Sequence, residues 1–140
     1  MAPLCAIRGS TTRPTFVKEI EIFGITAPTT SGALGLCRST ALGTGSLTSM
    51  TPLPHDPTGA TCGAVIVTAW ATLAPTVGAI TTVMRGWAQP VSIGNGVIWR
   101  FDDDDGLEIP LGNTATGELV IVNLMATAPG TFFISATLVE

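Results

Sequence analysis

Four consecutive carboxylates at residues 102–105, followed by Gly106, form the most conspicuous polar feature of the sequence. Carboxylate oxygens are preferred ligands of Ca²⁺, which makes Asp102 and Asp104 a candidate calcium site. The run lacks the alternating acids and distal glutamate of an EF-hand loop, and side chains in a strand alternate between faces. A solvated hairpin turn closed by Asp-Gly explains it more simply, so we expect no metal ion or other cofactor.

A general base is suggested by His55 beside Asp56, with Ser46 or Ser49 as the nucleophile. The pair lies between two prolines in an expected surface loop, and the chain contains no G-x-S-x-G nucleophile elbow. We therefore interpret His55 as a solvated loop residue.

Glycoside cleavage needs two carboxylates flanking the scissile bond, and Glu108 and Glu118 are the candidate pair. Sugar-cleaving grooves usually also offer aromatic platforms, whereas this chain has no tyrosine. Metal-dependent catalysis would lack ligands, because there is one histidine. We predict that the protein is not an enzyme.

The chain is short and poor in charge. Its 140 residues suit one domain, yet only 11% of them are charged, against about 25% in a typical soluble domain. A small domain has much surface to cover, so we expect part of that surface to be buried against other protein chains. The net charge is −4 with one lysine, Lys18, and no basic cluster, which argues against a nucleic-acid partner.

The cysteines and the apolar runs indicate in which cellular compartment the protein is expected. The three cysteines are odd in number, have no C-x-x-C spacing and predict free thiols in a reducing compartment: Cys5, Cys37 and Cys62. Arg8 and Arg13 interrupt the N-terminal region before an apolar signal segment can form. The uncharged runs 57–84 and 119–139 are long enough to span a membrane, but proline and glycine break both, so we expect strands and no membrane partner.

Short strand-like runs separated by glycine and proline dominate the sequence, and no stretch carries a capped helical stripe. This pattern predicts an all-β, single-domain, jelly-roll-like sandwich of about eight strands. The expected strands are residues 15–23, 33–40, 64–71, 79–87, 97–101, 119–125 and 131–139, with a short eighth near 107–110.

Several strands carry finer expectations. Residues 15–23 alternate Ile20 and Ile22 with Glu19 and Glu21, although Lys18 then falls on the apolar face. Residues 64–71 are expected to be buried on both faces beside 79–87. Residues 119–125 and 131–139 are expected to pair around a turn at 126–130.

Two segments lack strand character. Residues 1–14 predict an extended N-terminal arm outside the 15–140 sandwich domain, and residues 41–63 a long polar loop. Such segments often contact partners. The interface residues that we predict are Arg8, Arg13, Met50, Pro52, Leu53, Arg85 and Trp87.

The second half of the chain carries a diffuse order of strand and turn motifs. They are Thr68-Ala69-Trp70, Ala74-Pro75-Thr76, Met84-Arg85, Gln89-Pro90, Ile93-Gly94-Asn95-Gly96-Val97-Ile98-Trp99, Phe101, Gly106-Leu107, Ile109-Pro110, Leu119-Val120-Ile121-Val122-Asn123 and Val139-Glu140. This order resembles the jelly-roll cement, or decoration, proteins of tailed bacteriophage capsids. The acidic run at 102–105 departs from that pattern, where a shorter turn is expected.

The resemblance implies a structural protein on the outer capsid surface of the virion, made in the host bacterial cytoplasm. It would bridge subunits of the major capsid protein, and each copy would favour the expanded lattice by its binding free energy. We expect a homodimer, with a homotrimer as the alternative. The alternative function is a phage receptor- or carbohydrate-binding jelly-roll module that uses Trp87 and the acidic run.

Overall fold

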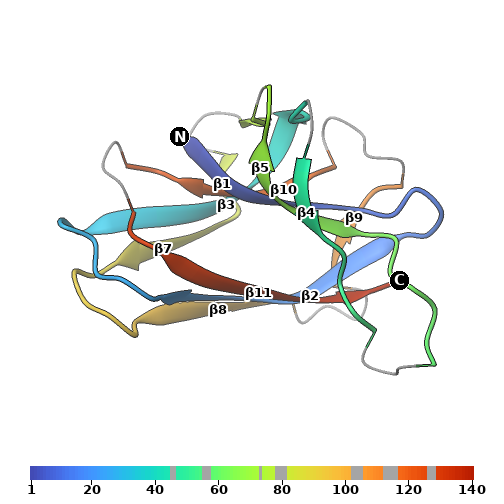
Figure 1. Cartoon of the computed structure of the whole chain (residues 1–140). Coiled ribbons are helices and arrows are strands. Elements are labelled where there is room, and N and C mark those ends of the chain that lie inside the picture. Colours follow the sequence, from blue (N-terminus) through green and yellow to red (C-terminus); the bar gives the residue numbers. More distant parts are fainter. Residues whose placement is uncertain are drawn as a thin grey trace.

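The computed structural model describes residues 1–44, 47–54, 58–72, 74–77, 82–101, 106–111, 117–125 and 129–140. They form antiparallel strands in two stacked layers (Figure 1), which confirms the predicted all-β sandwich. The strands are β1 Ala2–Arg8, β2 Thr15–Gly24, β3 Gly32–Ala41, β4 Leu47–Met50, β5 Val65–Trp70, β6 Thr76–Val77, β7 Arg85–Gln89, β8 Gly96–Arg100, β9 Leu107–Ile109, β10 Leu119–Asn123 and β11 Phe132–Val139.

The larger layer has seven strands in the order β4-β5-β1-β10-β3-β6, with β7 also pairing with β3. The smaller layer has four strands in the order β11-β2-β8, with β9 pairing with β2 beyond the end of β8. Strand β2 is therefore the centre of the smaller sheet. The chain connects strands of both layers repeatedly, since β1, β2 and β3 alternate between them.

The core lies between the layers and draws apolar side chains from both of them. Burying an Ile or Leu side chain stabilises a fold by roughly 1.5–3 kcal/mol, so the core between the two sheets is the main source of stability. Its buried members are Cys5, Ile7, Val17, Ile20, Ile22, Leu34, Leu36, Trp99, Ile109, Leu119 and Ile121. A second cluster covers the outer face of the larger sheet around Cys37, Val120 and Val122, so every residue of β10 is buried.

A β-bulge at Lys18 explains the exception in the alternating pattern of β2. Thr137 pairs with Glu19 while Leu138 pairs with Val17, so Lys18 is one extra residue on β2. The bulge changes the parity of the strand, and Val17 faces the core together with Ile20. Lys18 is thereby removed from the apolar face on which strict alternation would place it.

The prediction of an extended N-terminal arm is wrong for residues 2–8. Strand β1 lies inside the larger sheet between β5 and β10, and the side chains of residues 5–10 are buried. Sequence alone misses this strand because Pro3 and Arg8 interrupt an otherwise apolar run. Residues 2–8 are therefore part of the sandwich domain and not an appendage.

Other differences concern pairing. Strands β10 and β11 do not form a hairpin, because β10 pairs with β1 and β3 while β11 pairs with β2 in the other layer. Strand β7 pairs with β3 instead of β5, and β4 lies within the predicted loop 41–63. The prediction that residues 64–71 are buried on both faces is wrong for β5, where Val67 alone is buried, because the strand lies near the edge of its sheet.

Candidate protein-binding surface

The outer face of the smaller sheet carries a cluster of exposed apolar side chains. Phe23 on β2 lies directly opposite Phe133 on β11, and Ile98 follows on β8. The loops at this end of the sheet add Ile25 and Ile93, where Gly24 and Asn95 are joined by a backbone hydrogen bond of 2.9 Å. Exposed fractions reach 56% for Phe133 and 69% for Ile93. We call Phe23, Ile25, Ile93, Ile98 and Phe133 the outer apolar patch.

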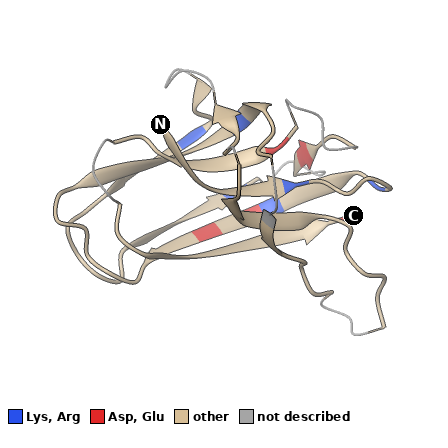
Figure 2. Ribbon diagram, turned by 45° about the horizontal axis from the view of Figure 1, so that its top comes forward, with Lys and Arg blue, Asp and Glu red and all other residues tan. Residues whose placement is uncertain are grey.

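Charge is sparse around this patch. Figure 2 shows the described ribbon with only short blue or red segments, and the strand that leads to the C label carries none before Glu140. Glu21 lies opposite Ile98 on the same sheet face. The face then continues into the Arg100–Glu19 ion pair, whose nitrogen and oxygen are 2.6 Å apart. An apolar area rimmed by charged groups has the arrangement of a protein-binding surface.

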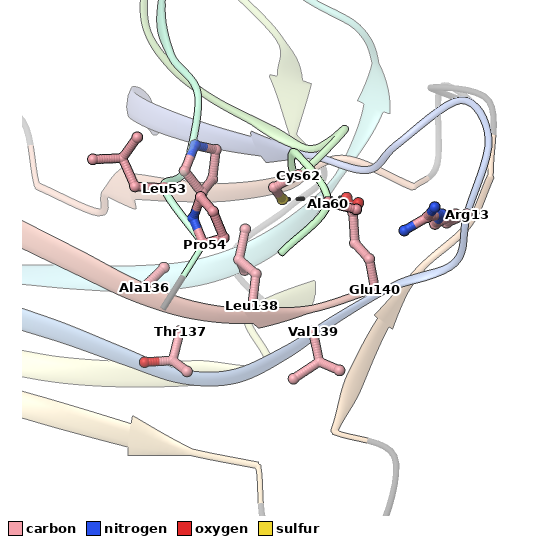
Figure 3. A pocket seen from close by; sticks show the side chains of 11 residues that line it. Arg13, Leu53, Pro54, Ala60, Cys62, Ala136, Thr137, Leu138, Val139 and Glu140 are labelled. Carbon is pink, nitrogen blue, oxygen red and sulfur yellow. Dashed lines mark hydrogen bonds between the residues drawn. The ribbon is translucent and has the colours of Figure 1, made fainter. Parts of the chain in front are cut away.

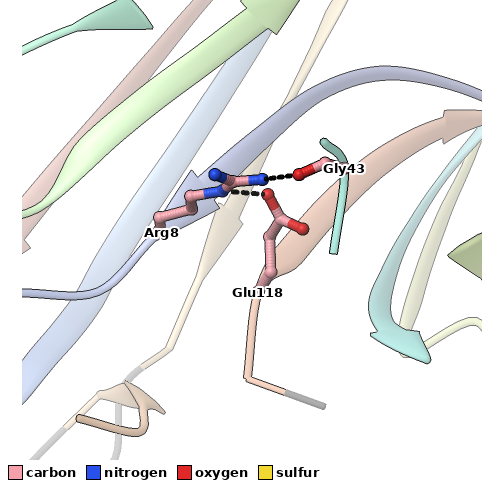
Figure 4. Close-up of polar contacts among 3 residues, drawn as sticks. All are labelled: Arg8, Gly43 and Glu118. Carbon is pink, nitrogen blue, oxygen red and sulfur yellow. Dashed lines mark hydrogen bonds and ion pairs between the residues drawn. The ribbon is translucent and has the colours of Figure 1, made fainter. Parts of the chain in front are cut away.

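The predicted interface role of Arg8 is wrong, because its side chain is buried inside the molecule. Its side chain is 9% exposed, and Nε donates to Oε1 of Glu118 at 2.7 Å (Figure 4). Nη2 donates to the Gly43 carbonyl at 2.8 Å. Arg8 is held inside the molecule by these contacts and is closed to a partner.

The predicted interface residues Met50, Pro52, Leu53 and Arg13 line two hollows that follow β11. Met50 is 56% exposed and Leu53 87% exposed. Arg13, Pro52 and Leu53 line one hollow of about 430 Å³ beside β11 (Figure 3). Met50 lines the next hollow, of about 460 Å³, beside the start of the same strand. Their predicted role at an interface remains a prediction.

Arg85 and Trp87 lie on β7 and already have contacts within the molecule. The guanidinium of Arg85 lies 5.8 Å from the centre of the Phe101 ring, although the residue is exposed. The Trp87 ring packs edge-on to Phe132 at 6.4 Å between centroids and is half-buried against the core. Their interface roles also remain predictions.

Glu140 is a structural residue that sequence reasoning missed. Its carboxylate accepts hydrogen bonds from Gly63 N–H at 2.9 Å, Ala64 N–H at 2.8 Å, the Thr15 hydroxyl and the Cys62 thiol. Burial alone would raise the pKa of Glu140, but these hydrogen bonds outweigh it and the pKa lies below its usual value. The carboxylate thus anchors the end of the β4–β5 connection to β11.

Asp102, Asp104, His55 and Ser46 lie outside the described residues. Glu118 is buried in its ion pair and is closed to a substrate, unlike the exposed Glu108. Among the residues that are described, no three His, Cys, Asp or Glu side chains gather as a metal site.

The three cysteines are free, and burial raises the pKa of each thiol, to about 12 for Cys5. These thiols are therefore protonated at neutral pH. Within the described ranges, no helix is long and apolar enough to cross a membrane.

Comparison with protein-family models, with curated proteins and with solved structures finds no match.

Proposed function

We propose that this protein is a structural protein that binds the outer surface of a bacteriophage capsid and stabilises it by bridging subunits of the major capsid protein. The observation that carries the proposal is the outer apolar patch on a domain in which 11% of residues are charged. Covering the patch with another protein removes apolar surface from water, which favours association.

The resemblance to jelly-roll cement proteins supplies the capsid as the partner, and it implies a jelly-roll arrangement of the sandwich. In that setting each bound copy adds contacts that must break before neighbouring capsid subunits separate. Many copies on one lattice reinforce each other through avidity. A homodimer that pairs through the outer apolar patch carries two capsid-binding faces, and a homotrimer would carry three.

Co-sedimentation with capsids from the source virus tests the proposal. The purified protein should pellet with expanded capsids and raise the temperature at which they release DNA, while immature capsids should leave it in the supernatant. Equal binding to both forms, or to neither, would reject a cement role. A carbohydrate-binding module would instead leave capsids unbound and bind saturably on a glycan array.

A further inference from the structure

Strand β11 has one free edge. It pairs with β2 along its whole length, and no second strand among the described residues pairs with it. Its eight residues include no charged side chain and no proline. Native proteins usually protect such an edge with charge, proline or a covering element, because an unpaired edge is a template for another strand.

The pairing register identifies the backbone groups that this edge presents. Gly24 donates to Asn95 at 2.9 Å and accepts from Gly94 at 3.1 Å, so its N–H and C=O face away from β11. Because backbone groups alternate along a strand, Phe23 faces β11 and bonds its partner Phe133. The backbone N–H and C=O groups of Phe132, and of every second residue after it, then point away from β2 towards the free edge. The free-edge groups belong to Phe132, Ile134, Ala136 and Leu138.

The same four residues turn their side chains inward and pack against the core, yet each remains half-buried. Two consecutive hollows follow the strand beside them. The opposite wall is supplied by Leu4, Met50 and Ile66 of the larger sheet at one end. At the other end it is supplied by Pro52 and Leu53 of the β4–β5 connection. The space therefore follows the strand and has apolar walls, as an added strand requires.

Charge in this groove favours one kind of occupant. Its described charged residues are Arg13 and Glu140, and the Glu140 carboxylate is already bonded to Gly63 and Ala64. Arg13 has no ion pair with any described residue. A second copy related by two-fold symmetry runs antiparallel and would bring Thr131, which is uncharged, to the Arg13 end.

We infer that the free edge of β11 binds an extended, apolar segment of a partner protein as an added strand, with an acidic residue of that segment paired to Arg13. The inference rests on the proposed function for its choice of partner, which would be the capsid subunit. Main-chain hydrogen bonds supply affinity in this mode, while the side-chain contacts supply specificity.

The test uses a blocked seven-residue peptide of alternating Val and Thr with Asp at one end, prepared with the acid at either terminus. Fluorescence polarisation of the labelled peptide with the full chain should show saturable binding for one of the two. Two matched control peptides, N-methylated at the odd or at the even residues, lose the donors of one edge or of the other, and one of the two should bind at least tenfold more weakly than the unmethylated peptide. Equal binding of the methylated and unmethylated peptides would overturn the inference.

Two protein variants complete the design. Ala136→Pro removes a free-edge N–H that β2 does not use, so the fold should persist while peptide binding falls at least tenfold. A version of the same peptide with Lys in place of Asp should bind the parent more weakly than the Asp-ended peptide. Arg13→Glu should reverse this preference, and Arg13→Lys should keep it. Unchanged preference in Arg13→Glu contradicts the acidic partner and does not depend on how Ala136→Pro folds.

The outcomes separate this inference from the proposed function. Capsid binding that survives in folded Ala136→Pro removes the strand-addition site and leaves the cement role intact. Peptide binding without capsid binding keeps the strand-addition site and removes the cement role. A wild-type dimer that Ala136→Pro abolishes, with no peptide bound, assigns the edge to a second copy and overturns the inference.

Discussion

At the scale of single residues, the most constrained group is the buried pair of Arg8 and Glu118. Two charges removed from water are tolerated only when each is closely partnered. Oε1 of Glu118 has that partner, while Oε2 has none among the described residues. The pair also links β1 to the residue that precedes β10 and to the Gly43 carbonyl.

Removing one member of this pair should be costly. Arg8→Ala leaves a buried carboxylate without its cation, and we expect the free energy of unfolding to fall by about 3–5 kcal/mol. The double variant Arg8→Met, Glu118→Leu should lie within about 1–2 kcal/mol of the parent, because no charge remains buried. Urea unfolding measures both. A mild Arg8→Ala paired with a severe double variant would contradict this account.

Glu140 predicts a dependence of stability on pH. Its folded pKa lies below its unfolded value, so its stabilisation is present above the unfolded pKa and is lost as pH falls through the folded pKa. Glu140→Gln should lower stability at pH 7 by about 1–2 kcal/mol, since it loses charge-assisted hydrogen bonds. The difference between parent and variant in thermal unfolding should shrink as the pH falls below the ordinary pKa of a glutamate, towards the lower folded pKa. A difference independent of pH would show that the charge is not involved.

Neither of these residue contacts is readable from the sequence. Arg8 and Glu118 are 110 positions apart, and Glu140 reaches back to Gly63. A chain with few charges offers one usable signal, namely that each buried ionised group needs a partner. That signal says that Arg8 has a partner if it is buried, but it does not say which. The interface prediction for Arg8 failed at this point.

At the scale of elements, strand positions were largely predictable while pairings were not. Alternation and turn residues predict β2, β3, β5, β8 and β11 within one or two residues. They do not predict which layer a strand enters, because β10 is buried on both faces and has no alternation to read. The Lys18 bulge likewise appears in the sequence only as an exception to the pattern.

Strand β1 yields a direct test. Deleting residues 1–8 removes the strand between β5 and β10 and exposes backbone groups on both, so we expect loss of cooperative thermal unfolding. The matched control deletes residues 1–3, which lie at the exposed start of the strand, and should retain the fold. A folded protein after the longer deletion would show that β1 is dispensable after all.

At the scale of the whole molecule, a 14.3 kDa domain with few charges exposes a row of aromatic and aliphatic side chains. The composition predicted that some surface is covered by other chains, but it did not predict which strands carry that surface. Phe23 and Phe133 are far apart in sequence and adjacent through the β2–β11 register. Long-range pairing decides this, so sequence pattern alone could not place the patch.

The proposed dimer supplies a whole-molecule prediction. Phe133→Ser should weaken self-association at least tenfold, because aromatic residues at the centre of an interface often contribute 2 kcal/mol or more. Light scattering should give a mass of twice 14.3 kDa for the parent and shift toward 14.3 kDa for the variant. Thr137→Ser, on the same strand face, is the matched control. Equal masses for parent and Phe133→Ser would exclude the patch from the dimer.

Amide hydrogen exchange on capsid-bound protein, read by NMR after release, tests the central claim most directly. In the free protein, the amides of Phe133 and Ser135 should exchange slowly, because they bond β2, while those of Ile134 and Ala136 exchange fast. Binding to the capsid should slow exchange at Ile134 and Ala136. Unchanged exchange at all of these amides on protein that does pellet with capsids would contradict the account.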